Sequence, residues 1–91
     1  MSHLSAQKDQ ILARIRRIAG QVAAIERAIE GEAECSAVLH QVAGVRGAVN
    51  GLMDELIQEH VMEHVAHPDL SPAERAAGAE ELIVAIRRYA K

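Results

Sequence analysis

Residues 34–66 read ECSAVLHQVAGVRGAVNGLMDELIQEHVMEHVA, and apolar side chains recur through them at alternating spacings of four and three residues. The residues that share this spacing are Val38, Val42, Val45, Val49, Leu52 and Leu56. Such a period places them on one face of a helix and is typical of helices that pack lengthwise against other helices. The segment therefore predicts one long helix that ends just before His67 and Pro68.

The same pattern predicts an earlier helix over about residues 5–30. Its apolar seam has the same alternating spacing and consists of Ile11, Ile15, Ile18, Val22, Ile25 and Ile29. Gly31 follows the seam as a stop signal. Three polar residues, Arg14, Arg17 and Gln21, lie three and four positions apart off the seam, so we predict that they share one outward stripe.

A last helix is predicted over about residues 72–90 by the residues at its start. Ser71 reads as the N-cap, Pro72 as the first helical residue, and Glu74 lies three positions after the cap. The three segments predict an all-α fold. We expect a three-helix protomer in which residues 1–91 form a single domain.

The composition agrees with a helical chain and indicates that it needs a partner. Among its 91 residues there is one aromatic, Tyr89, and the apolar remainder is mostly aliphatic. So short a chain with so little aromatic mass is expected to complete its core against another subunit. A lone cysteine, Cys35, cannot form an internal disulfide and favours the cytoplasm. No segment holds the ~20 apolar residues of a membrane span, so no membrane partner is expected.

Residues that can hold a metal gather at both ends of the long predicted helix. His60 and His64 lie one turn apart and can bind one metal from the same face. Cys35 lies on the same seam but 25 residues before His60, which is about 37 Å along a helix. An antiparallel partner helix would place the thiol of one subunit beside the imidazoles of the other. The spacing therefore predicts a two-fold dimer with a metal site at each end.

Other interpretations of these residues stay open on spacing alone. A lone cysteine on an apolar seam is often only a small buried hydrophobe. Residues 60–64 also match H-x-x-E-H, in which two histidines hold zinc and Glu63 activates water in a peptidase. We expect no enzyme, because a peptidase needs a further ligand and a cleft, and only 27 residues follow His64. A purely structural helical adaptor would explain the seams but would leave the ligands unused.

The charge is unevenly distributed along the chain, although its net value is only −3. The first 27 residues hold five basic residues and two acidic ones, whereas residues 52–81 hold eight acidic residues and one basic one. A basic first helix on an acidic body is a pattern found at nucleic-acid interfaces. Charge alone favours an ordinary solvated surface, because the chain has no long basic run.

Residues 14–22, RIRRIAGQV, followed by Cys35 and by residues 45–53, VRGAVNGLM, resemble the CsoR/RcnR family of bacterial metal- and stress-sensing repressors. The resemblance extends over essentially the whole chain. It implies an antiparallel dimer that forms a helical bundle, and a homotetramer built as a dimer of dimers. It also implies binding of double-stranded operator DNA through basic residues on flat faces. The matching residues are Arg14 and Arg17 first, with Lys8, Arg16, Gln21 and Arg46 as helpers.

The ligand positions indicate which effector the resemblance implies. Copper(I) sensors of the family carry a second cysteine where this chain has His64, and persulfide sensors also need two cysteines. The nickel/cobalt-sensing branch is matched by His3, Cys35, His60 and His64, with Glu34 and Glu63 as further candidates. Zn(II) would also accept four such ligands. The resemblance thus implies a repressor that is released from DNA by Ni(II) or Co(II) and so derepresses metal efflux.

An alternative within the same family is a formaldehyde-responsive repressor. That branch is expected to trap the aldehyde with the residue matching Cys35 and with an N-terminal proline amine. Here position 2 is Ser2, followed by His3, so the proline is missing. We therefore rank aldehyde sensing second.

Overall fold

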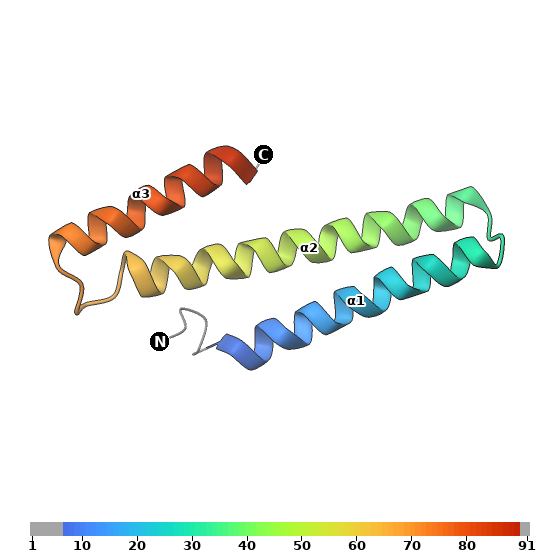
Figure 1. Ribbon diagram of the computed structural model, residues 1–91, viewed down its shortest axis with the longest axis horizontal. Helices are drawn as coiled ribbons and strands as arrows, with labels where there is room; N and C mark the ends of the chain where they lie inside the picture. The colour runs from blue at the N-terminus through green and yellow to red at the C-terminus, as the bar shows by residue number, and fades with distance from the viewer. Residues whose placement is uncertain (1–6, 90–91) are drawn as a thin grey trace. The chain divides into compact units, whose positions relative to one another are not determined.

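The computed structural model describes residues 7–89, and three helices account for nearly all of that range (Figure 1). They are α1 (Lys8–Glu30), α2 (Cys35–His64) and α3 (Pro72–Tyr89). No strand occurs within residues 7–89, so the all-α prediction is confirmed. None of the described helices is long and apolar enough to cross a membrane. The chain divides into two compact units, residues 7–54 and, among the described residues, 55–89.

The observed helix ends differ from the predicted ones by a few residues. α1 begins at Lys8 after Gln7, and the predicted start at residues 5 and 6 lies outside the described residues, as does the predicted end of the last helix at residue 90. α2 stops at His64, two residues before the predicted end. The N–H groups of Val65 and Ala66 both donate to the Val61 carbonyl, at 3.0 and 2.7 Å. This closes the last turn early, and the chain leaves the helix before His67.

The turn between α1 and α2 is a Schellman motif, but its left-handed residue is not the glycine. Gly31 occupies the C-cap with a φ of −86°, while the next residue, Glu32, has a φ of 59°. Glu32 donates its N–H to the Ile29 carbonyl at 3.1 Å, and Ala33 donates to the Ala28 carbonyl at 2.9 Å. Gly31 therefore ends the helix as predicted, but the backbone conformation that glycine favours falls one residue later.

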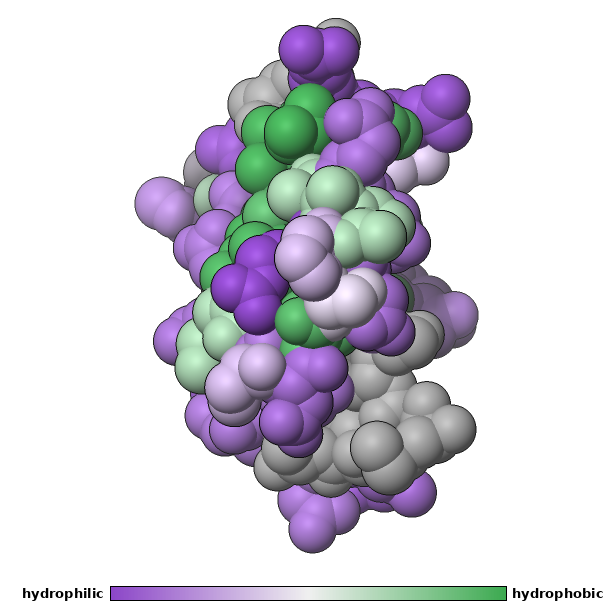
Figure 2. Space-filling model, turned by 90° about the vertical axis from the view of Figure 1, so that its left-hand side faces the viewer, coloured by the Kyte–Doolittle hydropathy of each residue, from purple (hydrophilic) through white to green (hydrophobic). Residues whose placement is uncertain are grey.

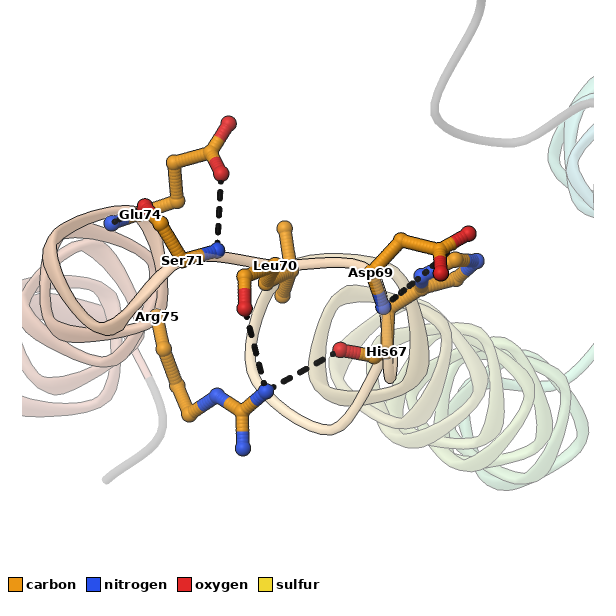
Figure 3. Close-up of polar contacts among 6 residues, drawn as sticks. All are labelled: His67, Asp69, Leu70, Ser71, Glu74 and Arg75. Carbon is orange, nitrogen blue, oxygen red and sulfur yellow. Dashed lines mark hydrogen bonds and ion pairs between the residues drawn. The ribbon is translucent and has the colours of Figure 1, made fainter.

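The start of α3 is the capping box that its sequence predicts (Figure 3). The Ser71 hydroxyl accepts the Glu74 N–H at 3.1 Å, and a Glu74 carboxylate oxygen accepts the Ser71 N–H at 2.8 Å. The preceding linker is closed by the Arg75 guanidinium, which donates to the carbonyls of His67 and Leu70 at 3.2 and 3.4 Å. Reciprocal bonds of this kind satisfy donors that a helix start otherwise leaves open.

In the unit of residues 7–54, α1 and α2 run antiparallel, and each apolar seam is only half covered (Figure 1). On α1, Ile11 is buried with 4% exposure and Ile18 and Ile25 are half-buried, while Val38, Val45 and Leu52 form the corresponding row on α2. The alternate seam residues are exposed, namely Ile15, Val22, Ile29, Val42 and Val49. The covered and exposed rows each repeat every seven residues, so each helix has a second apolar row that the chain itself leaves open.

Apolar side chains also remain open to solvent in the unit of residues 55–89. They are Met62 on α2 and Ile83, Val84, Ile86 and Tyr89 on α3. Figure 2 shows hydrophobic surface, in green, lying among the hydrophilic residues on the face it presents. Among the described residues only Ile11 is a buried apolar side chain. A single chain therefore leaves much of its apolar surface uncovered.

Candidate metal centre and nucleic-acid interface

The two imidazoles at the end of α2 lie side by side. The ring centroids of His60 and His64 are 4.9 Å apart, and their planes are tilted by 41°. Both side chains are half-buried, and Glu63 between them is half-buried as well. Two imidazoles at this spacing are a common pair of metal ligands on one helix.

One of these rings is held by a backbone group of the next helix. The Nε2–H of His60 donates to the carbonyl oxygen of Gly78 in α3, at 2.9 Å. A carbonyl can only accept, so Nε2 carries the proton and Nδ1 of a neutral His60 keeps its lone pair. Gly78 was missed in the sequence analysis. The signal for it is a glycine in the interior of an otherwise alanine- and glutamate-rich helix, where it lowers helix propensity without an evident turn.

The thiol lies at the opposite end of the same helix. Cys35 is the first residue of α2 and is free and exposed. The carbonyl of the residue before it, Glu34, accepts the N–H groups of Ala37 and Val38 at 3.0 and 3.2 Å, so Glu34 caps α2 through its backbone and its side chain is exposed. His3 lies outside the described residues.

Within the described part of one chain, the ligand candidates are not gathered into a metal site. Twenty-five residues of continuous helix separate Cys35 from His60, about 37 Å at the rise of an α-helix. Within residues 7–89 no group of three His, Cys, Asp or Glu side chains is placed to hold a metal ion. The structure thus brings His60 and His64 together and leaves Cys35 apart from them.

The basic residues named by the sequence analysis fall into two sets. Four are exposed, namely Lys8, Arg16, Arg17 and Arg46. Arg14 is half-buried, and its guanidinium lies against α2 at Gly51, where an added Cβ would be 2.7 Å from Nη1. Gln21 is also half-buried, and its Oε1 is buried without a hydrogen-bond partner in the described part of the chain. The predicted outward stripe is therefore wrong for Arg14, because Gly51 leaves room for its guanidinium beside α2, and for Gln21, whose side-chain oxygen is buried.

A model of the family described as "Metal-sensitive transcriptional repressor" matches residues 7–88, which include all the described ligand candidates and basic residues. The chain belongs to this family, the CsoR/RcnR repressors. The match extends from just before α1 to the last turn of α3, so it covers all three helices.

Three similar proteins are informative, and one of them is described as responding to formaldehyde. An uncharacterized protein encoded in the bioA 5' region of Serratia marcescens is 50% identical over the full length of both chains. A transcriptional repressor RcnR homolog of Escherichia coli O139:H28 (strain E24377A / ETEC) is 48% identical over 47 residues, 52% of each chain. The structure is similar to that of the formaldehyde-responsive regulator FrmR of Salmonella enterica serovar Typhimurium, in a variant with one glutamate replaced by histidine. The TM-score is 0.84 at 45% identity, covering 90% of this chain and 92% of that one.

Membership of the metal-sensitive repressors fixes the broad role of the chain. These proteins regulate transcription and are not enzymes, so the H-x-x-E-H match at residues 60–64 does not mark a peptidase. The family implies an operator DNA partner, assembly of several subunits and a metal effector. The similarity to FrmR and to the RcnR homolog does not by itself identify the effector of this chain.

Proposed function

We propose that this repressor acts in the cytoplasm and binds operator double-stranded DNA when it is free of metal. Ni(II) or Co(II) would release it from the DNA and so derepress genes for metal efflux. The observation that carries the proposal is the histidine pair. His60 and His64 have ring centroids 4.9 Å apart, and Nε2 of His60 is hydrogen-bonded to the Gly78 carbonyl oxygen. A metal-bound histidine generally donates its other ring N–H to a carbonyl or carboxylate, so the bond to Gly78 supports His60 as a ligand.

The donor set fits borderline divalent ions. His60 and His64 of one subunit would hold the metal together with the exposed thiol of Cys35 from the other, and His3 is proposed as a further ligand. Two imidazoles and a single thiolate suit Ni(II), Co(II) or Zn(II), whereas Cu(I) prefers more sulfur. Glu34 and Glu63 add carboxylates at the two ends of α2. The bound ion would supply a positive charge that links two subunits.

The half-covered seams support the antiparallel dimer that this site needs. Val42 and Val49 on α2, at 47% and 42% exposure, form an apolar row that a partner helix would cover. Gly44 and Gly47 flank this row and have nothing within 4 Å of an added Cβ, which leaves room for a second backbone to approach closely. The exposed apolar residues of α1 and α3 would then serve the proposed pairing of dimers into a homotetramer.

The exposed basic residues support DNA binding through phosphates. Lys8, Arg16 and Arg17 lie exposed on or at the start of α1, and Arg46 lies exposed on α2. Exposed cations of this kind contact the DNA backbone and make binding strongly dependent on salt. Arg14 and Gln21, which are half-buried, are proposed to orient this surface as well as to contact DNA.

A second candidate effector is formaldehyde. It is favoured by the likeness to the formaldehyde-responsive regulator FrmR and by the free, exposed thiol of Cys35, a nucleophile that can add to an aldehyde carbonyl. It leaves the pairing of His60 and His64 without a role, and we rank it second for that reason.

The two effectors are distinguished by operator release. The metal-free protein selects its DNA from a random-sequence library, and fluorescence anisotropy follows the complex as Ni(II), Co(II), Zn(II) and formaldehyde are added separately. We expect release at stoichiometric Ni(II) or Co(II), lost in His64→Ala and kept in His40→Ala, a matched change at an exposed histidine of α2. Release by formaldehyde alone, unaffected by His64→Ala, would overturn the metal proposal in favour of the aldehyde.

A further inference from the structure

The contact between α2 and α3 in the unit of residues 55–89 depends on the absence of a side chain at one position. Gly78 is buried, and a Cβ built there would meet the backbone of His64: it would overlap the carbonyl oxygen and lie 2.7 Å from the carbonyl carbon and 2.9 Å from Cβ. The first two are backbone atoms of the last residue of α2 and Cβ is bonded directly to that backbone, so none of them can swing aside like the end of a long side chain. An alanine at this position would therefore push α3 away from α2.

The same glycine makes the hydrogen bond that fixes the His60 ring. Its carbonyl oxygen is 2.9 Å from Nε2, a distance that any outward shift of α3 would lengthen. The close approach of the backbone at Gly78 and the bond to His60 are thus two consequences of one packing arrangement. Helix propensity alone would favour alanine over glycine by about 1 kcal/mol in this interior position, so the glycine is locally unfavourable and tertiary packing has to offset its cost.

We propose that Gly78 is a positioning residue for the metal centre, which holds His60 in the Nε2–H tautomer so that Nδ1 is the nitrogen offered to the metal. The inference rests on the proposed function in taking His60 as a ligand. It adds that α3, which contributes none of the ligands named above, selects the donor atom through its backbone. Outer contacts of this kind orient the ligand ring and commonly change metal affinity about 10- to 100-fold.

The first test needs no metal and no variant. Long-range ¹H–¹⁵N correlation spectra of the metal-free full-length protein report which ring nitrogen carries the proton. We expect His60 to be protonated at Nε2 with a free Nδ1, while the exposed His40 serves as the internal reference for an ordinary solvated ring. A proton at Nδ1 of His60, or the same tautomer mixture as His40, would overturn the inference and leave the proposed function standing.

The second test uses Gly78→Ala with Gly20→Ala as the matched control, since an added Cβ at Gly20 on α1 has nothing within 4 Å. Gly78→Ala should release His60 into a mixture of tautomers and weaken Co(II) binding about tenfold or more, and Gly20→Ala should leave the tautomer as in the wild type. If Gly78→Ala keeps the wild-type tautomer, the positioning role is wrong whatever happens to affinity. If the wild type and Gly20→Ala both have the Nε2–H tautomer but neither binds Co(II), the proposed function fails instead.

Discussion

At the scale of the residue, the left-handed conformation of Glu32 is the clearest point of local strain. Its φ of 59° places a residue with a side chain in a region where glycine is favoured. The glycine directly before it, Gly31, has a φ of −86°, which any residue can adopt. A residue with a Cβ in this region is disfavoured by about 1–2 kcal/mol. The motif persists because its two backbone hydrogen bonds close the end of α1.

Glu32→Gly should therefore stabilise the protein by about 1 kcal/mol, after allowance for the greater freedom of glycine in the unfolded chain. The measurement is the thermal midpoint at fixed protein concentration. Glu30→Gly is the matched control. Glu30 is the last residue of α1, so the same replacement there should lower the stability of the protein. A lower midpoint for both variants would contradict the strain assigned to Glu32.

Arg17 provides a second prediction at this scale. It is exposed on α1, whereas Arg14 lies against Gly51. Arg17→Ala should weaken operator binding and reduce the slope of log affinity against log salt by about 0.9 if one phosphate contact is lost. Arg88→Ala, an exposed arginine on α3 outside the proposed DNA face, should leave both quantities unchanged. Equal effects of the two variants would show that only the total charge matters.

Residue spacing predicted the histidine pair but not what holds it. One turn of helix brings His60 and His64 together whatever surrounds them, so the pattern alone was sufficient. The Gly78 contact joins two helices, and no spacing within one helix reports it. The position of Arg14 was mispredicted for the same reason, because the space at Gly51 belongs to the neighbouring helix.

At the scale of the element, the start of α3 links charge to helix stability. The Ser71 N–H, and after it the Ser71 hydroxyl, hold the pKa of the Glu74 carboxyl below its ordinary value of 4.5. A carboxyl whose pKa is lower in the folded state stabilises that state above its unfolded pKa. This stabilisation is lost as the pH falls through the lower folded value.

The far-UV circular dichroism of the protein, which reports its total helix, should accordingly show a loss of helix as the pH falls below about 4.5, the ordinary value for Glu74. Glu74→Gln should lack this contribution, because its amide does not titrate, while Glu81→Gln on the same helix should behave like the wild type. Wild-type and Glu74→Gln curves that coincide in acid would contradict the capping role of the carboxylate.

Helix starts and stops were predictable to the extent that local chemistry sets them. Ser71, Pro72 and Glu74 specify the start of α3 by themselves, and the structure has the cap at that position. The end of α2 could not be placed as well, because His67 and Pro68 mark only where the helix must have ended. Val65 and Ala66, just before them, leave the helix by donating their N–H groups to the Val61 carbonyl, and nothing in the local sequence predicts these hydrogen bonds.

At the scale of the whole molecule, the uncovered apolar rows require assembly. Alternate seam residues of α1 and α2 within residues 15–49 are exposed in one chain, including Val22 at 50% and Val49 at 42%. The seams were predictable from period alone, but which half of each faces its own chain was not, since both halves are equally apolar. The proposed dimer covers the exposed half and brings Cys35 to the histidines of its partner.

Val49→Asp should disrupt this assembly, because it would bury a charge in the proposed interface. Sedimentation at micromolar concentration should show smaller species, and the thermal midpoint should fall and depend more strongly on protein concentration. Asn50→Asp places the same side chain at the next residue, which is off the seam and exposed, and should assemble normally. An unchanged oligomer for Val49→Asp would contradict the proposed interface.

The shared metal site is tested most directly by mixing subunits. Cys35→Ala and the double variant His60→Ala/His64→Ala are each expected to lack the thiolate-to-Co(II) charge-transfer band. After unfolding and refolding together, a mixed dimer has one intact site, formed by the cysteine of one chain and the histidines of the other. Random pairing predicts recovery of about a quarter of the wild-type band. No recovery on mixing, or a full band in either variant alone, would contradict a metal site built between two subunits.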